Sequence, residues 1–380
     1  MIVIKHYHYT TFPMERQAFG KDFPLNIPQA LENSQKICYN NQSDAKKRRQ
    51  RRKGEKRVKA LLRNTSAFSR FINQRNEGTL SHAYLLLYDD ATHTKTALKE
   101  LAKAVFYADE NEYGEYDRPA LARIAKLIDG EKYPDCLVYP KNEKRLNVDE
   151  CELIVEECFI HAVEGEKKVI LIDRFDEALP TAQNKLLKVL EEPHEGVLFL
   201  LSARTAYPVL QTVLSRVQKL EISPFSIEEV GACIKRNHEN KYSHEEIELT
   251  AAISCGSVGS AESLLASGYY KTLVDEAFSL ALCELSRLPV AAKKAGATKS
   301  KKELISLLRL IFRDAAFCKL GKEKMLLLAP EKEKIKAVAD KYSYAALLTA
   351  QERLSAAEKE LTFNANFAQC IELCMAHVLK

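Results

Sequence analysis

Two residues that could bind a nucleotide, Lys95 and Thr96, lie just after the apolar segment at 83–87. In the phosphate-binding pattern GxxxxGK[ST], the lysine reaches the terminal phosphates and the hydroxyl holds magnesium, while the glycines let backbone amides surround the phosphates. Asp89 and Thr94 stand at the two glycine positions here. Their side chains obstruct that backbone, and the Asp89 carboxylate would repel phosphate. The segment therefore predicts a degenerate loop that no longer binds nucleotide.

A further candidate, Asp173, ends the apolar run at 167–173. In nucleotide hydrolases of this layout an aspartate at this place orders magnesium, and a following glutamate helps to activate water. The next residue here is Arg174, whose side chain accepts no hydrogen bond or proton. We therefore regard Lys95, Thr96 and Asp173 as vestigial and expect no bound cofactor. Capping a turn at the strand end is the alternative role for Asp173.

Composition is that of a folded protein, with 46% hydrophobic and 29% charged residues in a chain of 380. No apolar run has the length of a membrane span, and the N-terminus does not read as a secretory signal, so we expect a cytoplasmic protein without membrane contacts. The ten cysteines include no CxxC pair. Structural zinc requires ligands at short spacing, so we expect no metal site.

Positive charge is concentrated in residues 46–59, "KKRRQRRKGEKRVK", which carry ten Lys or Arg against one Glu. Such a run repels itself and rarely forms a packed core, so we place residues 1–58 in a disordered extension outside the folded body. An arm that binds phosphate backbones is the other interpretation.

The rest of the chain predicts three folded parts. Between 59 and 224, apolar strands at 83–87, 133–139, 167–173 and 196–203 alternate with helices, which indicates an α/β domain with a parallel sheet covered on both faces. One of these helices is capped at Asn147, and another, at 181–192, ends before Pro193. Three short helices form a lid at 225–267. An all-helical domain occupies 268–380, with an exposed loop at the Lys-rich segment 293–302.

Four sequence motifs resemble those of a known protein family. The segments "AQNKLLKVLEEP", "TVLSR", "GSVGSA" and "LLRLIFRDAAFCKLG" occur in this order. Over residues 60–325 the chain resembles the bacterial DNA polymerase III clamp-loader subunits, above all the delta-prime subunit. The resemblance implies an AAA+-type α/β domain with a helical lid, followed by an all-α collar that holds the subunits together.

The resemblance also implies a role. Delta-prime hydrolyses no ATP itself but supplies an arginine finger to a neighbouring ATPase subunit; here Arg216 would be that arginine and Ser215 would position it. The implied partners are the gamma/tau and delta subunits, with the sliding clamp and primer-template DNA reached through the complex. Gly259 stands about where ATPase relatives carry a lid arginine that senses nucleotide. Residues 107–133 lack the cysteines of the zinc module that many relatives have.

The sequence also allows two other functions. A gamma/tau-like ATPase would still bind magnesium nucleotide through Lys95, Thr96 and Asp173. A nucleic-acid-binding protein would act through the basic N-terminal arm, with an affinity that falls as salt rises.

Overall fold

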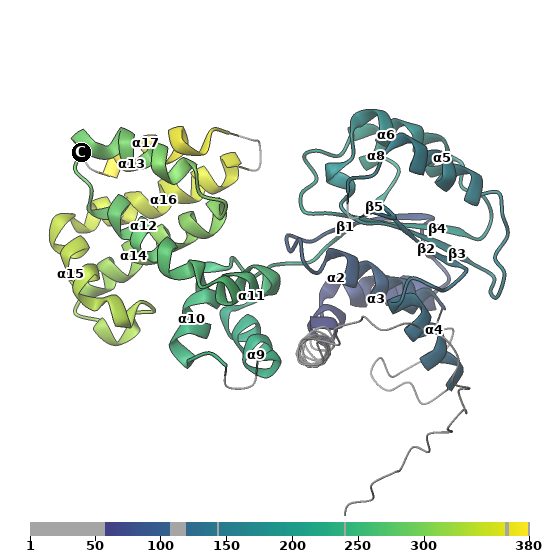
Figure 1. Ribbon diagram of the computed structural model, residues 1–380, viewed down its shortest axis with the longest axis horizontal. Coiled ribbons are helices and arrows are strands. Elements are labelled where there is room, and N and C mark those ends of the chain that lie inside the picture. The colour runs from purple at the N-terminus through teal and green to yellow at the C-terminus, as the bar shows by residue number, and fades with distance from the viewer. Residues whose placement is uncertain (1–57, 107–118, 143, 239–240, 362–364, 379–380) are drawn as a thin grey trace, which may run out of the picture. The chain divides into compact units, whose positions relative to one another are not determined.

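The computed structural model describes residues 58–106, 119–142, 144–238, 241–361 and 365–378. Its first half contains a five-stranded parallel sheet with strand order β2-β3-β4-β1-β5 (Figure 1). The strands are β1 (Ala83–Leu87), β2 (Cys136–Tyr139), β3 (Lys168–Ile172), β4 (Val197–Ala203) and β5 (Gln218–Glu221). Because the strands are parallel, the loops that follow them leave from one edge of the sheet, where parallel-sheet proteins place their sites.

Helices cover both faces of the sheet, as the nearly continuous apolar strands predict (Figure 1). Along β1, Tyr84 and Leu86 pack into one buried cluster, while Ala83 and Leu85 pack into a second cluster on the opposite face. The first face carries α2 (Ser66–Asn76), α3 (Thr94–Phe106) and α4 (Pro119–Asp129). The second carries α5 (Val148–Glu157), α6 (Pro180–Lys185), α7 (Leu187–Glu191) and α8 (Gln211–Leu214).

Only helices follow β5 in the described residues. Three short ones occupy the lid segment, residues 225–267: α9 (Ile227–Asn237), α10 (His244–Ile253) and α11 (Val258–Ser267). The C-terminal helical segment, residues 268–378, contains α12 (Tyr269–Leu282), α13 (Leu288–Gly296), α14 (Lys301–Lys319), α15 (Lys332–Lys341), α16 (Tyr344–Leu361) and α17 (Phe367–Val378). The parallel sheet and the helical second half confirm the predicted fold class.

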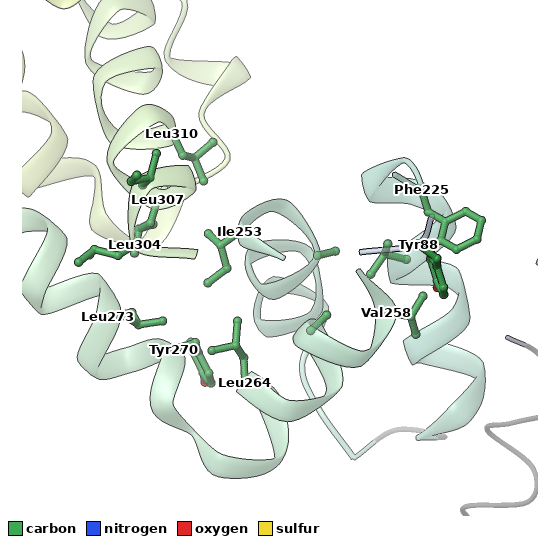
Figure 2. Packing of buried hydrophobic residues seen from close by; sticks show 14 of the residues in the cluster. Tyr88, Phe225, Ile253, Val258, Leu264, Tyr270, Leu273, Leu304, Leu307 and Leu310 are labelled. Atoms are coloured by element: carbon green, nitrogen blue, oxygen red, sulfur yellow. The ribbon is translucent and has the colours of Figure 1, made fainter. Parts of the chain in front are cut away.

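The buried cluster of the first sheet face continues through the lid segment. Tyr88, which follows β1, makes an edge-to-face ring contact with Phe225 at 6.3 Å between centroids. Ile253 and Leu264 extend the same cluster toward Leu304 of α14 (Figure 2). The lid helices thus share buried surface with the elements on either side of them in the sequence.

Some local predictions are confirmed. The Asn147 side chain accepts a hydrogen bond from the Glu150 amide at 2.8 Å and caps α5, as predicted. The expected helix at 181–192 is instead two helices. The Leu186 amide donates to Gln183 O, three residues earlier, at 3.2 Å. This 3₁₀-type turn separates α6 from α7 at Leu186, which is fully buried.

The Lys-rich segment 293–302 forms the expected loop only at residues 297–300. Its first residues belong to α13 and its last begin α14. Lysine and alanine favour helix, and Ala292 and Ala295 are buried on one side of α13. The predicted extension, residues 1–58, lies outside the described residues apart from Val58, which is helical and fully buried. In the part of the chain that the structure describes, no helix combines the length and apolarity needed to cross a membrane.

A network of buried charged residues holds α3, the helix that follows the degenerate phosphate loop, in place. The fully buried Glu100 accepts hydrogen bonds from Arg63 Nε at 2.8 Å and from Lys103 Nζ at 2.6 Å. Lys103 is only 1% exposed and also contacts Asp129 at 2.7 Å. Burial alone would lower the pKa of Lys103, but Glu100 and Asp129 outweigh burial and raise that pKa. Lys103 therefore stays charged, and the buried charges of Lys103 and Glu100 compensate each other.

We expect Glu100→Ala to lower the free energy of unfolding by about 3–5 kcal/mol, because it removes the carboxylate partner of Arg63 and one of the two carboxylate partners of buried Lys103. Urea unfolding of the full chain, followed by far-ultraviolet circular dichroism, measures the change. Glu152→Ala is the control, since Glu152 pairs with Lys185 at 2.7 Å on the surface and should contribute less than about 1 kcal/mol. Equal effects of the two substitutions would contradict the importance of the buried network.

Candidate functional site

The predicted loop residues point to partners within the chain. Lys95 Nζ lies 3.6 Å from the Glu131 carboxylate. Asp89 is 45% exposed and forms an ion pair with Lys302 of α14. Thr94 is buried at the start of α3, and its hydroxyl has no hydrogen-bond partner among the described residues. Lys95 and Asp89 are therefore engaged away from any shared ligand.

The neighbouring Asp90, which the sequence pattern did not single out, fills the loop. Its side chain is fully buried and accepts hydrogen bonds from the backbone amides of Thr92 at 3.1 Å and His93 at 3.2 Å. The lid segment contributes the Gly259 amide at 2.9 Å. Asp89 was expected to be the carboxylate that excludes phosphate. The structure instead assigns that position to Asp90, because Asp89 is turned outward to Lys302.

Asp173 lies at the end of β3, two strands away from β1 in the sheet. It is 4% exposed, and its carboxylate accepts a hydrogen bond of 2.7 Å from the Ser202 hydroxyl of β4. Arg174 adopts a left-handed backbone conformation with φ 53°, and its Nε lies 3.7 Å from the same carboxylate. Asp173 thus has a structural role between two strands.

These contacts do not fit a nucleotide with its metal. The Asp90 carboxylate already accepts hydrogen bonds from the amides of the turn that leads into α3. Lys95 faces Glu131, and Asp173 is hydrogen-bonded to Ser202. A phosphate placed on those amides would meet the negative charge of Asp90. In the described residues no group of three or more His, Cys, Asp or Glu side chains could hold a metal ion.

Arg216 and Ser215 form a separate site at the end of α8. Arg216 Nη1 donates to Thr212 O at 2.8 Å, and Nη2 donates to Glu191 Oε2 at 3.0 Å. The Ser215 hydroxyl donates to the same Thr212 carbonyl at 3.0 Å and lies 3.3 Å from Arg216 Nη1. Arg216 Nε is buried and has no hydrogen-bond partner in the residues described. The side chain as a whole is 29% exposed.

The fully buried Gln183 of α6 positions this site. Its amide nitrogen donates to Ala178 O at 3.0 Å and to Pro208 O at 3.1 Å, and its amide oxygen accepts from the Leu210 amide at 2.9 Å. These bonds fix the segment immediately before α8. The "AQNKLLKVLEEP" motif therefore supplies both the support, Gln183, and the carboxylate, Glu191, that holds Arg216.

Sequence reasoning identified that motif but not these two roles. Gln183 and Glu191 are ordinary polar residues of a helix until the fold brings residues 208–216 beside them. Gly259 was noted as a missing arginine, whereas the structure shows that it allows close contact with Asp90. The adjacent acidic pair Asp89 and Asp90 was the one local signal at the loop, and it did not indicate which carboxylate points inward.

Part of the chain is similar to known proteins. Residues 63–226 match the family model described as "DNA polymerase III, delta subunit", a segment that includes both the loop and the Ser-Arg pair. The delta-prime subunit of DNA polymerase III from Bacillus subtilis is 28% identical over 152 residues, covering 40% of this chain and 45% of that protein. The delta-prime subunit from Haemophilus influenzae is 29% identical over 150 residues, covering 39% and 44%.

The chain is similar to DNA polymerase III subunits over residues 63–226, less than half of its length. It matches less than half of the length of these curated relatives. Among solved structures, a gamma subunit-related protein from Thermotoga maritima aligns with a TM-score of 0.31 and 15% identity, covering 85% of this chain and 97% of that one. The clamp loader delta protein from Bacillus subtilis aligns with a TM-score of 0.30 and 13% identity, covering 82% and 99%.

From the loop geometry we expect the chain to bind magnesium ATP more weakly than a Kd of ~0.1 mM, equivalent to about −5.5 kcal/mol, and not to hydrolyse it. Isothermal titration calorimetry on the full chain measures the affinity. Lys95→Ala is the matched variant and should leave the titration unchanged, because Lys95 is already directed to Glu131. Tighter binding that is lost in Lys95→Ala would show that the loop still functions.

Proposed function

We propose that this chain is a non-hydrolysing, delta-prime-like subunit of the DNA polymerase III clamp loader. In this role it helps to load the sliding clamp onto primed DNA in the cytoplasm and assembles with gamma/tau and delta subunits. The observation that carries the non-hydrolysing part is the Asp90 carboxylate, which takes the amides that a nucleotide phosphate would need. The similarity of residues 63–226 to DNA polymerase III subunits supports the remainder.

The arginine site supports a contribution to a neighbour's reaction. Arginine presents a planar fork of donors that matches two phosphate oxygens, and an arginine supplied from another subunit stabilises charge on a transferring phosphoryl group. The guanidinium of Arg216, whose side chain is 29% exposed, is positioned by bonds to Thr212 and Glu191. Exchange of Glu191 for a phosphate oxygen of a neighbouring subunit would engage the same nitrogen without moving α8.

The two alternatives receive less support. A gamma/tau-like ATPase requires Lys95, Thr96 and Asp173 to converge on one nucleotide, and the contacts of Lys95 and Asp173 lead elsewhere. The proposal of a nucleic-acid-binding arm concerns residues that, except for Val58, lie outside the described residues.

The C-terminal helical segment is proposed as the assembly domain, or collar. Large apolar side chains are exposed there, among them Val290 of α13 at 75% and Leu373 of α17 at 60%. The two helices pack closely against each other. A Cβ added at Gly296 of α13 would lie only 3.0 Å from the Cβ of Ala368 in α17. Exposed apolar residues on adjoining helices are suited to burial against another subunit.

We expect Arg216→Ala to leave folding and assembly intact but to reduce ATP hydrolysis about 10³–10⁵-fold at the one site that Arg216 serves. The exposed ion pair with Glu191 contributes little stability, about 0–1 kcal/mol. Single-turnover hydrolysis by a complex reconstituted with its partner subunits, clamp and primed DNA measures the effect. Arg216→Lys should rescue little, because a point charge does not reproduce the fork.

Glu191→Gln is the control for this experiment, because it removes the ion pair but keeps the arginine. Hydrolysis in that complex should stay at or above the unmodified level. If Arg216→Ala loads clamps and hydrolyses ATP at the unmodified rate, Arg216 is an ordinary surface residue and the proposed transfer of its side chain to a neighbour is wrong.

For the collar, we expect the double substitution Val290→Glu and Leu373→Glu to abolish co-elution with partner subunits on gel filtration, since charges would be buried in an apolar interface. The isolated chain should keep its circular dichroism, because both residues are exposed. Leu153→Glu on α5, at a residue that is 50% exposed, is the matched control and should still assemble. Co-elution of the double variant would move the assembly surface to another part of the chain.

A further inference from the structure

Asp90 is a buried carboxylate whose contacts extend beyond its own loop. Besides the amides of Thr92 and His93, it accepts from the Tyr88 hydroxyl at 3.2 Å and lies 3.1 Å from His93 Nδ1. Its bond from the Gly259 amide joins residues 169 positions apart in the chain. Burial alone would raise the pKa of this carboxyl, but His93, Gly259 and Ser257 outweigh burial and hold the pKa below its usual range.

The Asp90 carboxylate lies where backbone amides from the N-terminal ends of two helices, α3 and α11, point. Thr92 and His93 form the turn that leads into α3, and Gly259 is the second residue of α11 after its N-cap, Ser257. The first amides of a helix have no partner within the helix and favour a negative charge. In nucleotide-binding proteins, the amides of such a turn bind a phosphate group of the nucleotide. Here the charge comes from the chain itself.

Glycine at 259 permits this contact. A Cβ added there would lie 2.4 Å from Asp90 Oδ1 and 2.5 Å from Thr92 Cβ, closer than real Cβ contacts come. Neither atom is the far end of a long flexible side chain. Any larger residue at 259 would therefore push α11 away from the loop or displace the carboxylate.

The open hollow beside the contact does not reach the carboxylate. It has a volume of about 380 Å³ and is lined by Asp89, Thr92, Gly259 and Lys302, among others, but not by Asp90. Solvent and small ions in this hollow therefore meet the outer side of the loop. The contact between Asp90 and the lid segment is covered.

We propose that the Asp90 carboxylate is a built-in anion that replaces a ligand phosphate at the loop and latches the lid segment to it through Gly259. The position of the lid then depends on no bound nucleotide. This inference goes beyond the proposed function and does not require it, because every contact involved lies within the isolated chain.

Hydrogen exchange on the full-length chain, read by mass spectrometry, tests the latch. We expect Asp90→Ala to raise the exchange rate of α11 amides at least tenfold over the unmodified chain, while amides of β3 and β4 keep their rates. Asp90→Asn, which retains shape but loses the charge and one acceptor oxygen, should raise α11 exchange by a smaller factor. It also serves as the second variant if Asp90→Ala does not fold.

Asp89→Asn is the matched control. It removes the neighbouring carboxylate, which faces Lys302, and should leave α11 exchange unchanged. Addition of magnesium ATP to the unmodified chain should also leave α11 exchange unchanged, since the anion is already in place. Gly259→Ala should reproduce the effect of Asp90→Ala from the other side of the contact.

Three results would overturn the proposal. One is α11 exchange in Asp90→Ala that stays within a factor of two of the unmodified chain. Another is a rise that is equally large in β3 and β4, which would make Asp90 a general stability residue. The third is slower α11 exchange when magnesium ATP is added to the unmodified chain, because the lid would then respond to nucleotide.

Discussion

A carboxylate removed from water must find hydrogen-bond donors for its oxygens, or it cannot stay charged. Asp90 meets this requirement by drawing donors from its own loop and from Gly259 of the lid segment. The ring contact between Tyr88 and Phe225 lies in the same buried cluster, so polar and apolar contacts reinforce each other. The structure around the loop is therefore organised about a fixed negative charge, and the proposed loss of nucleotide binding rests on that charge.

The two sites differ in where their charges are directed. At the loop, Asp90 is enclosed by donors and is covered from solvent. At the end of α8, Arg216 keeps part of its guanidinium exposed, with an exposed glutamate as its partner. The loop carboxylate is thus satisfied within the chain, whereas Arg216 is partly exposed and paired only at the surface. That difference supports the proposal that Arg216 acts on a ligand held by another subunit.

Periodic and local signals predicted most of the fold. The apolar strands, the Asn147 cap and the three lid helices all follow from patterns within about ten residues, and the structure confirms them. The short strand β5, with two exposed residues among four, has no such pattern. At the site, the missing glycines predicted a changed loop, and in the structure the Asp90 carboxylate accepts hydrogen bonds from that loop. The choice of Asp90 over Asp89 depends on Gly259, a partner far away in the sequence, so no local rule could have identified it.

Gly259 also restricts how this chain can change over evolutionary time. An arginine at that position would need the space that Asp90 and Thr92 now occupy, so it cannot be accepted while the carboxylate stays. Loss of the carboxylate alone would leave the amides of Thr92 in the loop and of Gly259 in α11 without the acceptor they have now. Each single substitution is disfavoured by the residue that remains, so an arginine at position 259 would require coordinated changes in the loop and in α11.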